Sequence, residues 1–205
     1  MTRLTLPTAA LGDALPLPGR SPDQLDRMAV RRSASAQMLV APGPDPDEIE
    51  VLLTLGARTP DHGKLFPWRF VVLGPQCRAD LVTRLEVLAA RQPLPDPARA
   101  TLAKLIAPPL SILVISTPVR GHKVPVWEQE LSAGAVCMNL EHAANALGYA
   151  SSWITDWYSY DPEAAALFGV EPGERIAGFI HIGSLTQPPL ERPRPDMATR
   201  VTRLP

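Results

Sequence analysis

The chain has 205 residues, of which 45% are hydrophobic, and a formal net charge of -1 at pH 7. This length suits one domain with a substantial core and is short for two full-sized domains. A near-neutral chain without a block of like charge has little field to attract a polyanion, so a nucleic-acid partner is disfavoured.

The cysteine content and the N-terminal segment indicate the cellular compartment in which we expect the protein. Cys77 and Cys137 are too few for a disulfide framework and lack the spacing of metal ligands. Residues 1–21 carry a short apolar patch that Asp13 and several prolines interrupt, unlike the continuous apolar core of a secretory signal. No segment approaches the ~20 consecutive apolar residues of a membrane span. We therefore expect a cytoplasmic protein.

The periodic segments predict an irregular N-terminal extension over residues 1–21 and one domain over 22–205. Apolar residues at helical spacing predict helices over 22–32, 47–58, 76–90, 97–106, 129–147 and 162–168. Runs of β-branched and aromatic residues predict strands over 68–73, 110–116, 149–154 and 176–182. The second of these strands is continuously apolar, which is typical of a central strand buried on both faces. This order favours an α+β layered domain over a βαβ repeat.

The helix expected over residues 129–147 is the longest. Its apolar residues surround most of its circumference, which predicts burial. Gly134 in its middle costs roughly 1 kcal/mol relative to alanine unless another element packs closely against it. We therefore expect a tight helix–helix contact there, for which a dimer interface is one candidate.

Arg31, Arg32 and Ser33 lie at the end of the first expected helix and allow two interpretations. Basic residues at a helix C-terminus complement the helix dipole, and serine is common in the following turn. Two guanidinium groups and a hydroxyl can also bind a phosphate, although side-chain charge alone would have to hold it at this end of a helix. On these residues alone the first interpretation is favoured.

A second polar cluster lies in the turn before the first strand. Arg58, Asp61, His62 and Lys64 are ionisable, and the simplest interpretation is a solvated loop. His62, however, has no apolar periodic neighbours and is no obvious core histidine. This loop is therefore a candidate for ligand binding.

The segment HKVPVWEQELSAG, from His122 to Gly134, enters the longest helix. Its acidic residues suit ordinary helix capping. His122 with Glu128 or Glu130 lacks the spacing of a zinc site, and the two glutamates point to different sides, unlike a glycosidase pair. The chain also lacks a G-x-S-x-G elbow and a G-x-G-x-x-G fingerprint, so we assign no metal site and no nucleophile.

Four segments together resemble one family, the FMN-dependent nitroreductases, and above all its short bacterial NAD(P)H nitroreductases. In chain order they are RRSAS, RTPDHGKLFPWRFVVL, HKVPVWEQELSAG and GYASSWIT. The resemblance covers residues 22–204. It implies a nitroreductase-like layered sandwich, with a central, mainly antiparallel sheet flanked by helices, in an intertwined homodimer with FMN at the subunit interface.

The resemblance also implies roles for particular residues. Arg31, Arg32 and Ser33 would bind the phosphate and ribityl chain of FMN. Arg58 and His62 match positions that approach a flavin shared with the partner subunit.

The remaining positions concern the flavin ring, the dimer and the nicotinamide cofactor. Trp153, Ile154 and Thr155 match the segment that lines the isoalloxazine ring. The helix over 129–148 would lie in the dimer, and its end, 143–148, matches a stretch sometimes assigned to NAD(P). Lys64 and Phe66 stand where many larger relatives have Asn and Gln, and Arg200 or Arg203 is a candidate for their C-terminal phosphate contact.

The activity implied by the resemblance transfers hydride from NAD(P)H onto FMN and then to a small acceptor such as a nitroaromatic or a quinone. Because the cofactor carries this chemistry, we assign no acid–base catalyst among the side chains. Two alternatives stay open, because a fold does not determine a substrate. One is an oxidoreductase with a different acceptor, and the other is a flavin-binding protein without turnover.

Overall fold

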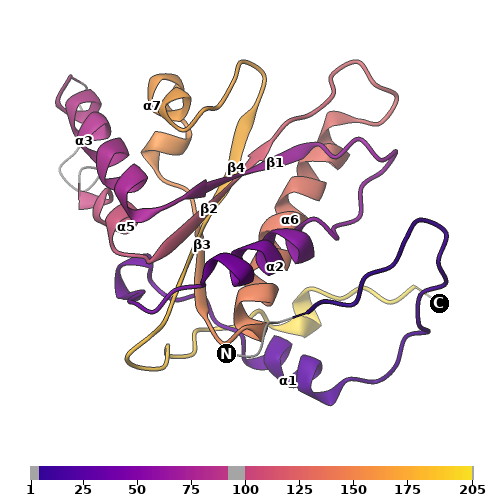
Figure 1. Cartoon of the computed structure of the whole chain (residues 1–205). Coiled ribbons are helices and arrows are strands. Elements are labelled where there is room, and N and C mark those ends of the chain that lie inside the picture. The colour runs from indigo at the N-terminus through magenta and orange to yellow at the C-terminus, as the bar shows by residue number, and fades with distance from the viewer. Residues whose placement is uncertain (1–4, 92–99, 205) are drawn as a thin grey trace.

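The structure, a computed structural model, describes residues 5–91 and 100–204. A four-stranded sheet in the order β1-β2-β4-β3 forms its centre (Figure 1). The strands are β1 (Trp68–Leu73), β2 (Leu110–Ser116), β3 (Ala150–Ile154) and β4 (Arg175–Gly183). Every neighbouring pair is antiparallel, which confirms the expected sheet, and the predicted strand bounds are right to within one residue.

The helices also follow the predicted order. They are α1 (Pro22–Val30), α2 (Pro46–Gly56), α3 (Pro75–Arg91), α5 (Ala103–Ile106), α6 (Val126–Ala146) and α7 (Pro162–Leu167), with short 3-10 turns η1 (Ala36–Met38), η2 (Trp157–Ser159) and η3 (Met197–Thr199). α2 begins at a complete capping box between Asp45 and Glu48. α6 begins three residues earlier than predicted, because the Pro125 carbonyl already accepts from the amides of Glu128 and Gln129. Of the helix expected over 97–106, residues 97–99 lie outside the described residues.

The helices form a layer on each face of the sheet (Figure 1): α2 and α6 on one, α3, α5 and α7 on the other. All seven residues of β2 are buried, and alternate side chains enter opposite cores, which confirms the prediction of a central strand. The core under α6 includes Leu52, Ile112, Val136, Leu140 and Ile180. The core under α3 includes Leu85, Leu113, Tyr158, Phe168 and Phe179.

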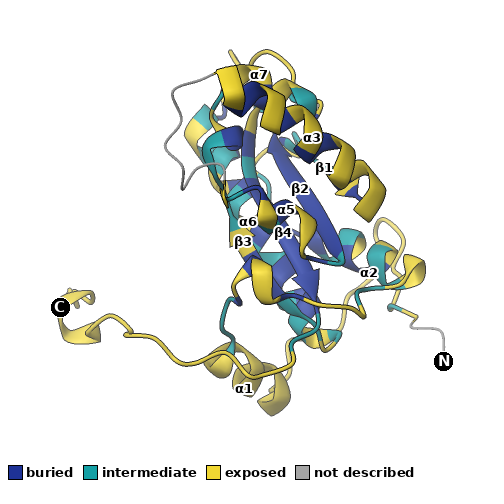
Figure 2. Cartoon of the chain, turned by 90° about the vertical axis from the view of Figure 1, so that its left-hand side faces the viewer, coloured by how far each residue is buried: buried dark blue, intermediate teal, exposed yellow. Residues whose placement is uncertain are grey.

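Both ends of the described chain lie outside these cores (Figure 2). Residues 5–21 contain no helix or strand, and the tail after Ser184 is largely exposed and extended apart from η3. α1 contains no buried residue. Neither core therefore includes a residue of α1.

A buried polar group lies in the core under α3. The Arg78 guanidinium donates to the Leu73 carbonyl at 3.0 Å and to Ser111 Oγ at 3.2 Å, and Ser111 Oγ lies 2.7 Å from Nδ1 of the fully buried His181. Burial, reinforced by the positive charges of Arg78 and Lys104, lowers the pKa of His181 to about 3. The His181 ring is therefore neutral in the folded protein near neutral pH.

We expect the free energy of unfolding to fall when the pH is lowered from 7. The unfolded histidine, with a pKa near 6.5, binds a proton that the folded ring excludes. The loss therefore grows as the pH falls from about 6.5 to about 3 and is about 2 kcal/mol at pH 5. Urea unfolding at pH 7, 6 and 5 should show this loss of unfolding free energy in the wild type. The loss should be smaller in His181→Asn, because the asparagine amide does not titrate in this range. Parallel pH curves for the two proteins would contradict the assignment.

Candidate functional site

Arg31, Arg32 and Ser33 lie against the beginning of β3. The Ala34 amide donates to the Ser151 carbonyl at 2.9 Å, which joins the segment after α1 to the edge of the sheet. Ser33 Oγ donates to Glu141 Oε1 at 3.4 Å, and Arg31 Nη1 lies 3.5 Å from Glu141 Oε2. The segment is therefore held by both β3 and α6.

Glu141, which the sequence analysis did not single out, is the centre of this cluster. It is 2% exposed, and its Oε1 also accepts from Ser151 Oγ at 3.2 Å. The signal in the sequence was an acidic residue among buried apolar positions of one helix face, next to Leu140 and Ala144. A buried carboxylate needs such partners, because desolvation without them is costly.

The two arginines keep donor atoms available. Arg31 Nη1 and Arg32 Nε are buried and have no hydrogen-bond partner among the described residues, and Arg32 Nη1 donates to the Ser33 carbonyl at 2.6 Å. Buried guanidinium nitrogens that make no hydrogen bond, beside a hydroxyl, suit an anion with several acceptor oxygens. The phosphate interpretation of this segment therefore has a geometric basis.

Trp153, Ile154 and Thr155 lie at the other end of β3. Ser151 and Ile154 are three residues apart, which places the two groups about 10 Å from each other along the strand. Trp153 Nε1 donates to the Ala177 carbonyl at 3.1 Å, and its indole lies over Gly178, where a Cβ would be 2.0 Å from Nε1. The chain therefore accepts only glycine beneath this tryptophan.

Arg58 and His62 lie in a second cluster. His62 Nδ1 is 2.7 Å from Glu128 Oε2 at the start of α6, and Arg58 is exposed just after α2. Glu128 and Glu141 are thirteen residues apart on α6, so about 20 Å of helix separates His62 from the Arg31–Ser33 segment. Arg58 lies further along α6, because its neighbour Thr59 accepts from Asn139 Nδ2 at 2.8 Å.

The loop of the second cluster is conformationally unusual. Lys64 and Phe66 have positive φ values of 56° and 47°, which non-glycine residues rarely adopt. The Asp61 carboxylate holds the loop by accepting from the Phe66 amide at 2.8 Å. Such strain persists only where surrounding contacts impose it, and it is often found at binding sites.

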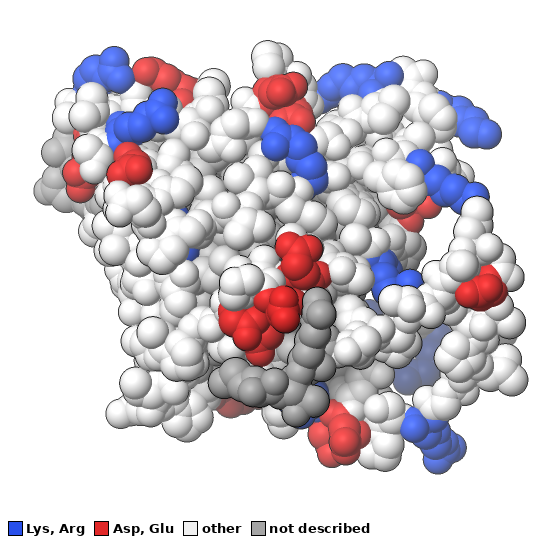
Figure 3. All heavy atoms as spheres, in the orientation of Figure 1, with Lys and Arg blue, Asp and Glu red and all other residues white. Residues whose placement is uncertain are grey.

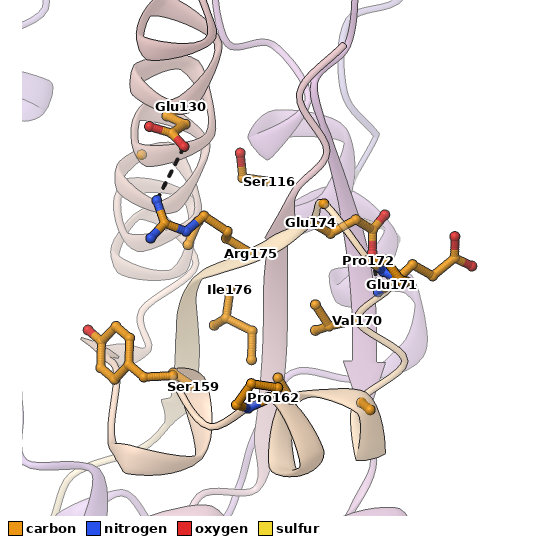
Figure 4. Close-up of a pocket in the computed structure, with 16 residues that line it drawn as sticks. Ser116, Glu130, Ser159, Pro162, Val170, Glu171, Pro172, Glu174, Arg175 and Ile176 are labelled. Atoms are coloured by element: carbon orange, nitrogen blue, oxygen red, sulfur yellow. Dashed lines mark hydrogen bonds and ion pairs between the residues drawn. The ribbon is translucent and has the colours of Figure 1, made fainter. Parts of the chain in front are cut away.

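A cavity of about 820 Å³ opens beside the end of β3 (Figure 4). It is lined by α6, the end of β2, the start of β4, and the segment from η2 through α7. Gly134 lies in its wall, and a Cβ there would be 3.9 Å from the Trp153 ring, its nearest neighbour. A Cβ at Gly134 would thus fit without a clash, and the tight helix–helix contact expected there is not made within the described residues.

The distribution of charge and of possible metal ligands over the described residues gives no further candidate site. Charged side chains of both signs are interspersed on the face in Figure 3 without a basic stripe. Among the residues that the structure describes, no three histidine, cysteine or acidic side chains gather as metal ligands, and no helix is long and apolar enough to cross a membrane.

Known sequences that are similar to this chain belong to one family. Residues 29–184 match the model of the Nitroreductase family. The chain is 35% identical over 164 residues to "Putative NAD(P)H nitroreductase YdjA" of Escherichia coli (strain K12), covering 79% of this chain and 88% of that protein. It is 30% identical, with the same coverage, to "Putative NAD(P)H nitroreductase" of Haemophilus influenzae (strain ATCC 51907 / DSM 11121 / KW20 / Rd).

Solved structures share the fold. A nitroreductase-like family protein from Bacillus cereus has a TM-score of 0.75 at 19% identity, covering 92% of this chain and 99% of that one. A nitroreductase with bound FMN from Bacteroides fragilis NCTC 9343 has a TM-score of 0.70 at 19% identity, covering 90% and 100%. These similarities confirm the expected nitroreductase-like fold.

Glu141→Ala should lower the free energy of unfolding by about 2 kcal/mol, because two hydroxyls lose an acceptor and Arg31 loses its counter-charge. Glu141→Gln keeps an acceptor oxygen and should lose less. Glu50→Ala, the same exchange at an exposed position of α2, should change stability by less than about 0.5 kcal/mol. Urea unfolding measures all three, and equal values for the two alanine variants would refute the structural role of Glu141.

Proposed function

The chain belongs to the nitroreductase family, and we propose that it is an FMN-dependent oxidoreductase that uses NAD(P)H to reduce a small acceptor such as a nitroaromatic or a quinone. The observation that carries this proposal is the arrangement along β3, with guanidinium nitrogens at one end that make no hydrogen bond to the described residues, and the segment with Trp153 at the other. The names of the relatives supply the nicotinamide reductant, and an FMN-bound fold neighbour supports the flavin.

The described residues fit FMN in the expected order. Arg31 and Arg32 would offer nitrogens that make no hydrogen bond within the described chain, and Ser33 a hydroxyl, to the phosphate. Trp153, Ile154 and Thr155 would line the isoalloxazine ring, with the ribityl chain along β3 between the two groups. FMN would supply the two-electron chemistry, and the protein would bind and orient it.

A second copy of the chain would complete the site. The resemblance assigns Arg58 and His62 to a flavin shared between subunits, and His62 lies at the start of α6, about 20 Å along the helix from Glu141 and the Arg31–Ser33 segment. The helix over 129–147 was expected to be apolar over most of its circumference and buried, but Leu131 is 53% exposed, and Trp127, in the first turn of α6, is 68% exposed. A homodimer packed on this helix would cover them and bring the partner's loop to the flavin.

The overall reaction conserves atoms and electrons without a protein nucleophile. NAD(P)H, a proton and a quinone yield NAD(P)⁺ and a hydroquinone, with the proton drawn from water. The C-terminal end of α6, over residues 143–148, is the segment proposed to contact the nicotinamide cofactor. The identity of the acceptor is not part of the family assignment.

Absorbance spectra and anaerobic stopped-flow mixing test the proposal. The protein purified and incubated with FMN should retain flavin absorbance after gel filtration, and NADH or NADPH should bleach it. Failure to retain FMN would overturn the proposal. Retention without bleaching by either nucleotide would instead favour a flavin-binding protein without turnover.

Arg31→Ala and Arg32→Ala should each weaken FMN binding about 10- to 100-fold, the loss expected for a charge-assisted hydrogen bond. Riboflavin, which lacks the phosphate, should bind the wild type and both variants with similar affinity. Arg84→Ala, at an exposed position of α3, is the matched control and should leave both affinities unchanged. Flavin fluorescence quenching gives the dissociation constants. An equal loss for FMN and riboflavin would show that the arginines do not hold the phosphate.

A further inference from the structure

We propose that the cavity beside β3 binds the electron acceptor and prefers an uncharged aromatic ring over an anionic one. The inference rests on the proposed function, because it needs the flavin ring at Trp153–Thr155. It adds a location and a charge preference for the acceptor.

The cavity shares its wall with the segment expected to line the flavin ring. Tyr160 lines the cavity, and its hydroxyl lies 2.7 Å from Thr155 Oγ1. Ala177, in the same wall, accepts from Trp153 Nε1. A molecule in the cavity would therefore lie directly beside the residues that hold the ring.

The lining suits a flat organic ring. One side is apolar and comes from α7 and the turn after it, and Tyr160 adds a 72% exposed ring. The apolar residues of that side are Pro162, Ala165, Ala166, Val170 and Pro172, and Ile176 of β4 adds a further apolar side chain. Ser116 lies at the opposite side, and its buried Oγ has no partner among the described residues, so a ligand oxygen that reached it would gain a hydrogen bond. A cavity of about 820 Å³ lies within the range usual for small-molecule sites.

The charges of the lining disfavour an anion. Glu130, Glu171 and Glu174 contribute carboxylates, and Arg175 is the one cation among the lining residues. Figure 4 shows Arg175 directed at Glu130, with Nη1 and Oε1 3.6 Å apart, so its charge is already offset.

Glu174 stays ionised at this site. Arg69 donates to both of its oxygens, at 3.0 and 2.6 Å, and this hydrogen bonding lowers the pKa of the carboxyl. Since Arg69 is engaged by Glu174, it offers no free charge to a ligand. An anionic acceptor would therefore meet three carboxylates, while the lining cation is ion-paired and Arg120, at the edge of the cavity, donates to the Gly173 carbonyl at 3.4 Å.

Two matched probes test the charge preference: 2-hydroxymethyl-9,10-anthraquinone and 9,10-anthraquinone-2-sulfonate. Both carry the same three rings, and neither has a ring carbon open to addition by the exposed Cys77 thiol. Dissociation constants come from tryptophan fluorescence quenching, with and without FMN, and KM values from NAD(P)H oxidation. The neutral probe should bind at least about tenfold more tightly, which corresponds to about 1.4 kcal/mol. Equal or tighter binding of the sulfonate would overturn the charge preference.

Ala166→Trp tests the location. Ala166 is an exposed residue of α7 in the cavity wall, so an indole there should fill the space and weaken the neutral probe at least about tenfold. Ala79→Trp places the same side chain at an exposed position of α3 outside the cavity and should have no effect. Unchanged binding in Ala166→Trp would refute the assignment of the cavity.

Glu130→Gln tests the electrostatic argument. It removes a carboxylate and frees Arg175, so sulfonate affinity should rise about three- to tenfold at low salt, with little change for the neutral probe. Glu163→Gln frees Arg91 from a comparable ion pair outside the cavity and should change neither affinity. A sulfonate gain in both variants, or in neither, would contradict the argument.

The two proposals can fail separately. A protein that does not retain FMN would fail the proposed function, while probe binding to the flavin-free protein could still be measured. A protein whose flavin is bleached by NAD(P)H, but whose probe binding is insensitive to Ala166→Trp, would fail this inference alone.

Discussion

The difference in length between β3 and β4 is the constraint on which both the site and the cavity depend. β3 pairs only with residues 179–183 of β4, so the first part of β4 lacks a partner on that side. The Trp153 indole covers this open edge by bonding to the Ala177 carbonyl, and Gly178 leaves the space that it needs. A longer β3 would close the edge and occupy the cavity, because a paired strand satisfies the same backbone groups.

α6 links the other parts of the site to this edge. Its Glu128 holds His62 at one end, its Glu141 holds Arg31 and Ser33 near the other, and Gly134 faces Trp153 between them. A rigid helix keeps Glu128 and Glu141 about 20 Å apart, so α6 sets the spacing of these three groups of residues.

Local patterns were sufficient for most of the fold. The run of residues 110–116 predicted β2 to the residue, because a continuous apolar segment can be buried on both faces only in the middle of a layered domain. The start of α6 was missed, because Val126 and Trp127 carry no helix-specific pattern and only the Pro125 carbonyl bonds reveal the first turn. Glu141 was missed because propensity gives no reason for a buried carboxylate until its partners are known.

By itself, the sequence determined the order and type of the elements, the family, and the residues expected to bind phosphate and flavin, because these depend on local periodicity and on motifs in fixed order. Tertiary structure alone decided that the segment after α1 lies against β3, that Glu141 joins it to α6, and that the open edge of β4 borders a cavity with three carboxylates. These contacts join residues about a hundred positions apart, such as Ser33 and Glu141. No local pattern encodes which distant side chains share a buried site, since that follows from packing of the whole sheet.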